Sequence, residues 1–509
     1  MNEFKPLPTP LLAVVTLALA MATFMQVLDT TIANVSIPSI AGELGVTPNQ
    51  GTWIITAFAA SNAIAMPLTG WLAKQFGEVR LFVLSTLLFA LTSMLCGLAP
   101  SYPLLIAARV LQGAVAAPMM PLSQSLLLAN YPHHKKGLAL AFWAMTATIG
   151  PIAGPLLGGY ITDNFSWSWI FFINVPIGLI SSFIVWQMLK NRETGTFKFP
   201  IDYVGLALLI LGVGTLQIML DKGNDLDWFA SPTIIALSVV SIIAVSFFIV
   251  WEWYDDNPVI DLSLFKNRNF TIGTITISLG YTVFLGGGVV FPLWLQTQLN
   301  YTAFWAGFAS ASVGIFAFLL SPVVGANLHR LNLRILVTAS FVLFAISYFW
   351  MAEFTTDIDI IHASLPRLVM GIGMAMFFVP LTSIIISEIH PSKIASAMGV
   401  VNFLRILGGG FGTSIAVSMW TIRTDYHHAI FSEQITGFSH LTDSLYTTLT
   451  GISIPALPVI NNIVNQQAST RANDDILLLS GCIFLALILL IWFTKPPFLT
   501  SKAKAPVLE

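Results

Sequence analysis

Long apolar runs, separated by short polar or Gly- and Pro-containing breaks, recur along almost the whole 509-residue chain. A helix needs about 20 predominantly apolar residues to cross the hydrocarbon core of a bilayer. Counted in this way, the sequence contains fourteen candidate spans. They lie near residues 11–37, 51–73, 81–99, 103–128, 137–162, 167–189, 203–220, 231–252, 270–296, 303–327, 333–352, 361–386, 395–420 and 476–493.

Lysine and arginine are distributed unevenly among the links between these spans. If the N-terminus is cytoplasmic, sixteen basic residues fall on the cytoplasmic side and three fall on the other, namely Lys222, Arg423 and Arg471. Cytoplasmic links of membrane proteins carry an excess of Lys and Arg. The distribution therefore predicts an even number of spans, with both termini in the cytoplasm.

The composition is that of a polytopic membrane protein: 56% of the residues are hydrophobic and 9% are charged, whereas soluble domains carry about 25% charged residues. The two cysteines, Cys96 and Cys482, lie in apolar runs, so we expect neither a disulfide framework nor a metal site. The sequence contains no Walker-type phosphate loop, no HExxH pair and no GxSxG elbow. We therefore expect a protein that is not an enzyme, needs no cofactor and draws its energy from an ion gradient.

An internal repeat predicts a duplicated architecture. The segment Arg109-Val-Leu-Gln-Gly113 of span four returns as Arg367-Leu-Val-Met-Gly371 in span twelve, eight spans later. Two six-span halves alone would separate equivalent segments by six spans, so two additional spans must lie between the halves. Such repeats are typical of transporters, whose binding sites lie between the repeats. The predicted fold is all-α, with a six-span half at 1–200, two inserted spans at 201–252 and a second six-span half at 253–509.

One acidic residue, Asp29, lies well inside the first span. An aspartate near the centre of a spanning helix costs about 2.5–3.5 kcal/mol on insertion scales, so it is expected to face protein or water. Helical spacing places Gln26 on the same face and Asn34 on an adjacent one. This polar seam predicts a water-accessible cavity in which Asp29 exchanges a proton. The alternative is that Asp29 lies at the level of the lipid headgroups.

Span four carries a second intramembrane charge, Arg109, followed one turn later by Gln112. Met120 continues roughly the same face. A buried guanidinium needs carboxylates, carbonyls or water as partners, and Asp29 is the one acid that we place deep in a span, with Asp221 and Glu252 near span ends. Either Arg109 responds to the protonation of Asp29, or it only ties helix ends together. The residues alone leave both interpretations open.

Span five combines small residues with prolines. Gly150, Gly154 and Gly158 recur every four residues and form a smooth face that permits close helix approach. The prolines remove backbone donors and bend or loosen a helix. We interpret the segment as a hinge or a tight seal between helices; the alternative is packing alone. The remaining members of this motif are Pro151, Pro155 and Gly159.

Aromatic and cationic side chains in other spans are candidates for a cargo cavity, because aromatic surfaces adapt to many apolar shapes. The alternative is packing or lipid contact for the aromatic residues and, for the cation, a tie between helices through backbone carbonyls. Our candidates, besides those already named, are Trp143, Phe284, Phe377 and Arg405. The long link 421–475 is a further candidate, either as a segment that docks a partner or as a passive cap.

Several of these segments together resemble one family. Leu28-Asp29-Thr30-Thr31-Ile32-Ala33-Asn34-Val35, Arg109 to Gly113 and Gly150 to Gly159 are similar to the first-, fourth- and fifth-span motifs of fourteen-span drug:proton antiporters of the major facilitator superfamily, and most of all to the EmrB branch of the EmrB/QacA family. One departure is the loop Gly70-Trp-Leu-Ala-Lys-Gln-Phe-Gly-Glu78, which lacks the usual acid and arginines.

The resemblance implies a function. It implies export of hydrophobic or amphipathic toxic compounds in exchange for protons, with Asp29 as the protonated acid and Arg109 as the motif arginine. It further implies a bacterial inner-membrane location and two partners, a periplasmic adaptor of the EmrA type and an outer-membrane channel of the TolC type. The alternatives are an uptake symporter of the same fold and a membrane sensor that transports nothing.

Overall fold

The computed structural model describes residues 8–132, 150, 153–196, 202–255, 258–328, 331–389, 394–435 and 456–496. Within these ranges the regular structure is helical, without strands. Thirteen helices in this part of the chain are long and apolar enough to cross a membrane. The fourteenth predicted span, 137–162, is only partly described, and its residues 153–164 are helical.

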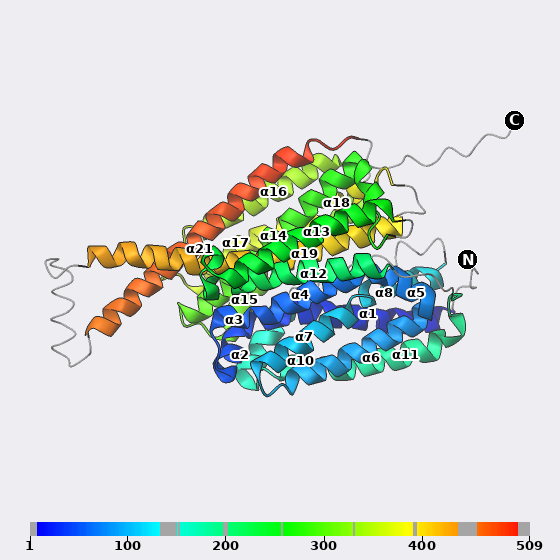
Figure 1. Cartoon of the computed structure of the whole chain (residues 1–509), viewed down its shortest axis with the longest axis horizontal. Coiled ribbons are helices and arrows are strands. Elements are labelled where there is room, and N and C mark those ends of the chain that lie inside the picture. Colours follow the sequence, from blue (N-terminus) through cyan, green and yellow to red (C-terminus); the bar gives the residue numbers. More distant parts are fainter. Residues whose placement is uncertain are drawn as a thin grey trace.

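The first part of the chain forms an N-terminal bundle (Figure 1). Its helices are α1 (Thr9–Ile32), α2 (Ile37–Leu44), α3 (Pro48–Gly51), α4 (Trp53–Ala65), α5 (Thr69–Phe76), α6 (Glu78–Gly97), α7 (Tyr102–Ala116), α8 (Met119–Asn130), α10 (Trp169–Phe172) and α11 (Asn174–Leu189). Helix α4 packs against α7, and α1 packs against α11.

Two inserted helices and a C-terminal bundle follow. The inserted helices are α12 (Tyr203–Lys222) and α13 (Pro232–Tyr254). The C-terminal bundle contains α14 (Arg268–Thr297), α15 (Ala303–Asn327), α16 (Leu333–Met351), α17 (Ile360–Ala375), α18 (Phe378–Ile386), α19 (Ile394–Gln434) and α21 (Ala456–Ile491). Helix α13 packs on α12, and α12 also touches α4 and α19. The domain boundaries at residues 200 and 252 stay a prediction.

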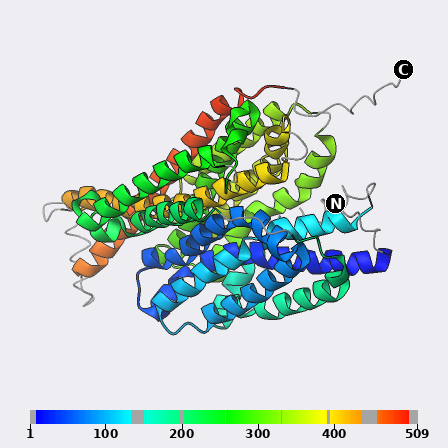
Figure 2. The same cartoon turned by 45° about the vertical axis from the view of Figure 1, so that its right-hand side comes forward.

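Helices α19 and α21 continue far beyond the predicted spans 395–420 and 476–493. A span predicted from hydropathy ends where polar residues begin, but the helix itself can continue. Neither extension contains a glycine, and the one proline, Pro458, lies in the first turn of α21, where it does not break the helix. The two extensions project from the bundle as a hairpin (Figures 1 and 2). The predicted link 421–475 is therefore largely helical at both ends, and its residues 436–455 lie outside the described ranges.

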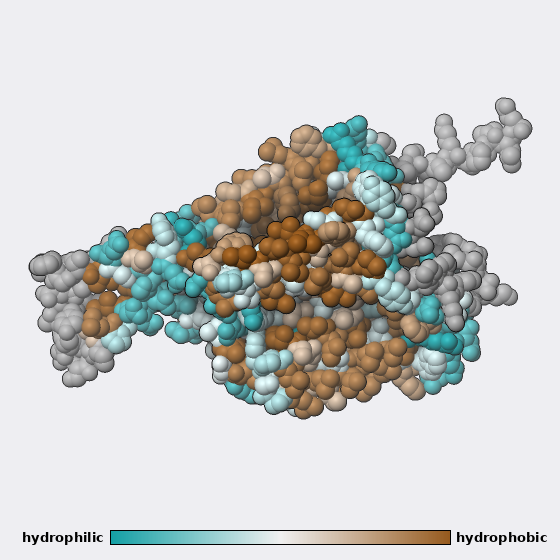
Figure 3. Space-filling view, in the orientation of Figure 1, coloured by the Kyte–Doolittle hydropathy of each residue, from teal (hydrophilic) through white to brown (hydrophobic). Residues whose placement is uncertain are grey.

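The molecule has two distinct ends. Helix α1 begins and α21 ends at one end, here called the terminal end; the hairpin projects from the other, here called the hairpin end (Figure 1). A broad hydrophobic surface separates hydrophilic residues at the two ends (Figure 3). Such a belt is what a bilayer requires of a spanning protein, because lipid cannot hydrogen-bond polar groups.

Polar contacts join the two bundles. Asn49 donates a hydrogen bond to the Thr421 hydroxyl at 2.7 Å. The Asp163 carboxylate accepts from the backbone N–H groups of Ala303 and Phe304, at 3.2 and 2.7 Å, and so caps the first turn of α15. The Asp163 bonds hold the first turn of α15 against the N-terminal bundle. The Asn49 bond holds the start of α3 against α19.

Candidate functional site

Asp29 lies one turn before the end of α1 and is fully buried, with an exposed fraction of 0%. The polar seam around it is buried as well, because Gln26 and Asn34 are only 5% and 6% exposed. A side-chain oxygen of each amide has no hydrogen-bond partner in the described part of the chain. In this conformation the seam is thus enclosed by protein, and its opening to water stays a prediction.

The Asp29 carboxylate forms a buried ion pair with Arg109 of α7, whose Nη1 lies 2.5 Å from Asp29 Oδ2. Gln112, one turn further along α7, accepts from Arg109 Nη1 at 2.7 Å and donates to Asp29 Oδ1 at 3.2 Å. Arg109 Nε donates to the Ile54 carbonyl of α4 at 3.0 Å. The i, i+3 spacing places Arg109 and Gln112 on one face of α7, so a single helical turn supplies both partners of the acid.

Sequence reasoning did not single out Asn174, which completes the surroundings of the acid. Its Nδ2 donates to Asp29 Oδ1 at 2.9 Å and approaches Ser93 Oγ of α6 at 3.0 Å. Cys96 Sγ donates to Gln112 Oε1 at 3.4 Å. An asparagine inside the apolar run of span six was the available signal, since an amide in lipid needs a partner.

Aromatic rings cover the guanidinium. The Arg109 Cζ atom lies 4.3 Å from the ring centre of Phe58 and 5.5 Å from that of Phe171. Rings stabilise a cation electrostatically and exclude water from it. Because water is excluded, removing either charge of the Asp29–Arg109 pair would leave the other one buried without compensation.

The small residues of span five lie against α1, one turn apart. A Cβ atom at Gly150, Gly154 or Gly158 would overlap α1 at Val27, Thr31 or Ile32, respectively. The Thr31 hydroxyl also donates to the Gly150 carbonyl at 3.3 Å. Glycine at these positions therefore brings the backbone of span five onto the helix that carries Asp29.

The same span meets the C-terminal bundle. A Cβ atom at Gly159 would overlap the Ala303 carbonyl, and one at Gly307 of α15 would overlap the Pro155 carbonyl. Span five therefore approaches α15 closely, and its function as a hinge or a seal stays a prediction. Pro151 lies outside the described residues.

The predicted cargo residues have different surroundings. Phe377 is 1% exposed and packs among aromatic rings that include Phe344, so it is a core residue in this conformation. Phe284 and Met120 are half-buried. Arg405 lies over the rings of Tyr281 and Phe378, at 5.2 and 5.5 Å, and its Nε atom has no hydrogen-bond partner in the described ranges. Trp143 lies outside those ranges.

The internal repeat has a structural counterpart, with one difference. Arg367 of α17 points its Nη2 toward the Ser310 carbonyl of α15, at 3.4 Å, much as Arg109 reaches α4. Gly371 and Gly113 each lie against a carbonyl of the neighbouring helix. However, Arg367 forms no ion pair among the described residues. Only the N-terminal copy of the arginine is thus seen paired with an acid.

Buried acids are more numerous than the sequence suggested. Glu252 is 3% exposed and Asp474 is 6% exposed, although both lie near the predicted span ends. The Asp221 carboxylate is bonded to three side chains. Helix packing therefore buries acids near the span ends that lipid depth alone would leave exposed, and the depth of Asp29 within its span stays a prediction.

A bundle of spanning helices with a duplicated arginine and a buried charge pair defines a polytopic membrane transporter rather than an enzyme. The chain belongs to the Major Facilitator Superfamily, whose family model matches residues 19–413. The fourteen-span count is compatible with the thirteen spans seen in the described ranges.

Relatives cover nearly the full length. The chain is 50% identical over 503 residues to the multidrug export protein EmrB of Escherichia coli (strain K12), covering 98% of each chain. It is 49% identical over 500 residues to the fatty acid resistance protein FarB of Neisseria gonorrhoeae, covering 97% of this chain and 98% of FarB. A bacterial homolog of the human lysosomal transporter Spinster, solved in an inward-facing and occupied conformation, shares the fold with a TM-score of 0.62 at 14% identity, over 94% of this chain and 96% of that one.

Proposed function

We propose that this chain is a proton-coupled antiporter that exports hydrophobic or amphipathic toxic compounds across the bacterial inner membrane. The observation that carries the proposal is the buried pair of Asp29 and Arg109, held by Gln112 and Asn174. The names of the relatives, a multidrug export protein and a fatty acid resistance protein, support export as the direction and amphipathic compounds as the cargo.

The pair couples a proton to the arrangement of the helices. A proton on Asp29 removes the negative charge, and the oxygens of Gln112 and Ile54 are then the remaining hydrogen-bond acceptors of Arg109 among the described residues. A buried charge that loses its partner costs about 3–5 kcal/mol. Protonation therefore favours another arrangement of α1 and α7, in which Arg109 reaches water or other oxygens.

The C-terminal bundle offers a contact for cargo. The Arg405 guanidinium lies over two aromatic rings and keeps an unused N–H donor. A cation beside apolar rings suits an amphipathic compound that carries an acidic group, because the rings hold its apolar part and the guanidinium holds the acid.

The length and the exposed apolar residues of the hairpin support the proposal of a partner outside the membrane. Helix α19 contains 41 residues, which at 1.5 Å per residue gives a length of about 60 Å, roughly twice the hydrocarbon thickness. Leu457 and Ile463 of α21 are 71% and 43% exposed on the projecting part. We infer that the hairpin end is periplasmic and docks an adaptor of the EmrA type that leads to an outer-membrane channel of the TolC type.

Everted membrane vesicles test the function. We expect them to accumulate an amphipathic dye or drug when the lumen is acidic, and to lose this accumulation on addition of nigericin. The variant Asp29→Asn removes the proton acceptor, so gradient-driven accumulation should fall at least tenfold while exchange of cargo without a gradient persists. An Asp29→Asn variant with full gradient-driven accumulation would contradict the proposal.

A further inference from the structure

Asp221 lies at the hairpin end of the inserted helix α12, where three parts of the molecule meet. Its carboxylate accepts hydrogen bonds from Thr56 of α4 at 2.8 Å, from Ser414 of α19 at 2.5 Å and from Gln217 of its own helix at 3.0 Å. Gln217 Nε2 also lies 2.7 Å from the Ser414 hydroxyl. One carboxylate thus connects the N-terminal bundle, the inserted helix and the C-terminal bundle.

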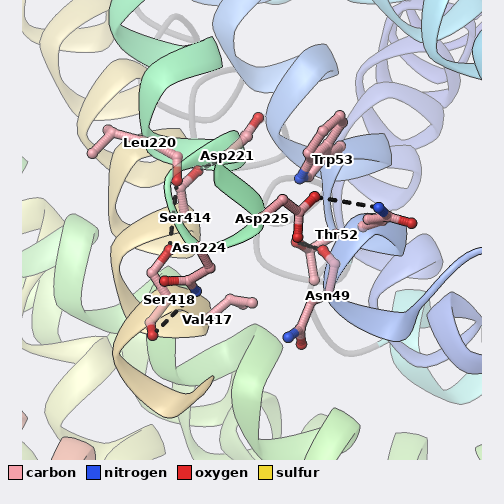
Figure 4. A pocket seen from close by; sticks show the side chains of 11 residues that line it. Asn49, Thr52, Trp53, Leu220, Asp221, Asn224, Asp225, Ser414, Val417 and Ser418 are labelled. Carbon is pink, nitrogen blue, oxygen red and sulfur yellow. Dashed lines mark hydrogen bonds between the residues drawn. The ribbon is translucent and has the colours of Figure 1, made fainter. Parts of the chain in front are cut away.

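The surroundings of Asp221 are polar. Figure 4 shows it beside a small pocket between α4, α12 and α19, with Ser414 and Asn224 on the same side. Three other charged or titratable groups lie near it. Asp225 accepts from Gln50 Nε2 at 3.2 Å, and Tyr102 donates to the Gln50 carbonyl. Lys222 lies over the Trp53 ring. The three side chains bonded to the Asp221 carboxylate are a hydroxyl from each bundle and the Gln217 amide of its own helix.

The same turn of α4 reaches the Asp29 site. The Ile54 carbonyl accepts from Arg109 Nε at 3.0 Å, and the Thr56 hydroxyl, two residues later, donates to Asp221. A helical turn moves as a unit, because its backbone hydrogen bonds fix the positions of its carbonyls and side chains relative to one another. Any shift of Arg109 that displaces Ile54 must therefore also displace Thr56 relative to Asp221.

We propose that Asp221 is a positioning residue for export, which clasps the two bundles together at the hairpin end and is coupled through Ile54 and Thr56 to the Asp29–Arg109 pair. When the pair is intact the clasp holds the hairpin end closed. When the pair separates, the displaced turn of α4 loosens the clasp and lets this end open. The coupling rests on the proposed function, whereas the clasp itself does not.

Cysteine cross-linking measures closure of the hairpin end directly. Asn49 and Thr421 are hydrogen-bonded across the two bundles at 2.7 Å, so cysteines at these positions, in a chain with Cys482→Ser, should cross-link rapidly in the otherwise unchanged protein. Asp221→Asn should slow the cross-linking at least threefold, because the neutral side chain keeps one of the two acceptor oxygens. Asp221→Glu should restore part of the rate.

Asp225→Asn is the matched control, because Asp225 lines the same pocket and bonds Gln50. It should leave the cross-linking rate unchanged. An equal effect of the two variants, or no effect of Asp221→Asn, would overturn the clasp. Size-exclusion profiles and melting temperatures identify a variant that fails to fold. If Asp221→Asn fails to fold, Ser414→Ala replaces it as the test and should slow the cross-linking to the same extent.

The coupling has its own readout. Asp29→Asn, which breaks the ion pair, should also slow cross-linking, and Thr56→Val should abolish this response while Asp221 stays charged. A full response to Asp29→Asn in the Thr56→Val background would overturn the coupling. Cross-linking needs neither cargo nor a gradient. Vesicles that fail to accumulate cargo would therefore refute the proposed export, whereas the cross-linking rate alone decides whether the clasp exists.

Discussion

At the scale of single residues, the Asp29–Arg109 pair places two opposite charges in the interior of the protein. Both side chains are essentially inaccessible to solvent, at 0% and 1% exposed, so neither charge is hydrated. Protein groups replace water around both charges. Two amides and a guanidinium bind the acid, and besides the acid two oxygens and two rings contact the arginine. The pair is therefore stable as a unit and sensitive to the loss of either member.

Removing the arginine alone should destabilise the protein. We expect Arg109→Met to lower the free energy of unfolding by about 3–5 kcal/mol, because it leaves the Asp29 carboxylate buried and uncompensated. Adding Asp29→Asn should recover most of this loss, since no charge then remains. Apparent melting temperatures in detergent check both results; two variants whose effects simply add would show that the pair is not coupled.

The proposed cargo contact at Arg405 predicts selectivity. Hydrogen bonds to charged groups are worth about 1.5–3 kcal/mol, so Arg405→Gln should weaken export of an acidic amphipathic compound by about tenfold or more. Export of a neutral compound of similar size should change much less. Transport of a matched acid and ester in vesicles measures the difference, and an equal loss for both would argue against the contact.

At the scale of helices, close approach at glycine decides how span five packs. Gly159 and Gly307 each lie against a carbonyl of the other bundle, so there is no room for a methyl group at either position. The contact lies near Asp163, which caps α15, and so belongs to the hairpin end of the molecule.

Alanine at these positions should therefore force the bundles apart. Overpacking typically costs about 1–3 kcal/mol, and we expect Gly159→Ala or Gly307→Ala to slow transport and to slow the 49–421 cross-link. Gly288→Ala in α14 is the control, because a Cβ atom there would meet no neighbour within 4 Å. Equal behaviour of all three variants would show that the contact does not limit the transport cycle.

The spanning helices and the small-residue stripe were predictable from the sequence, because the length of an apolar run and a four-residue spacing depend only on residues that are close together in the chain. The extent of α19 was not, since hydropathy falls where the helix leaves the lipid although its backbone bonding continues. The contact between Asp29 and Arg109 was only one of two interpretations, as pattern alone does not orient α1 against α7. Asn174 and Asp221 were missed because their importance depends on partners distant in sequence.

At the scale of the whole molecule, the hairpin projects from the membrane bundle as a separate part (Figure 1). The hairpin is fastened at its base, where Arg423 Nε and His427 Nε2 of α19 lie 2.7 and 2.8 Å from Asp475 Oδ2 of α21. Further along α21, Gln466 donates to the Gln298 carbonyl, whereas the side chains of Leu457 and Ile463 are exposed.

Removal of the hairpin should consequently separate two activities. We expect replacement of residues 438–467 by a short Gly-Ser linker to leave gradient-driven accumulation in vesicles within about twofold, because the Asp29 site stays intact. The same variant should lose drug resistance in cells and co-purification with its adaptor. Undiminished resistance in cells would exclude the hairpin as the docking segment.

The unequal arginines of the two repeats have an electrical consequence. If Asp29, the one acid seen paired with a repeat arginine, is the group that titrates in the cycle, each turnover exchanges a single proton for one molecule of cargo. Export of a monovalent cation would then move no net charge, whereas export of a neutral compound would carry one charge inward and gain about 2.3 kcal/mol from each 100 mV of membrane potential. An anionic compound would carry two, so the voltage would favour acidic cargo most strongly.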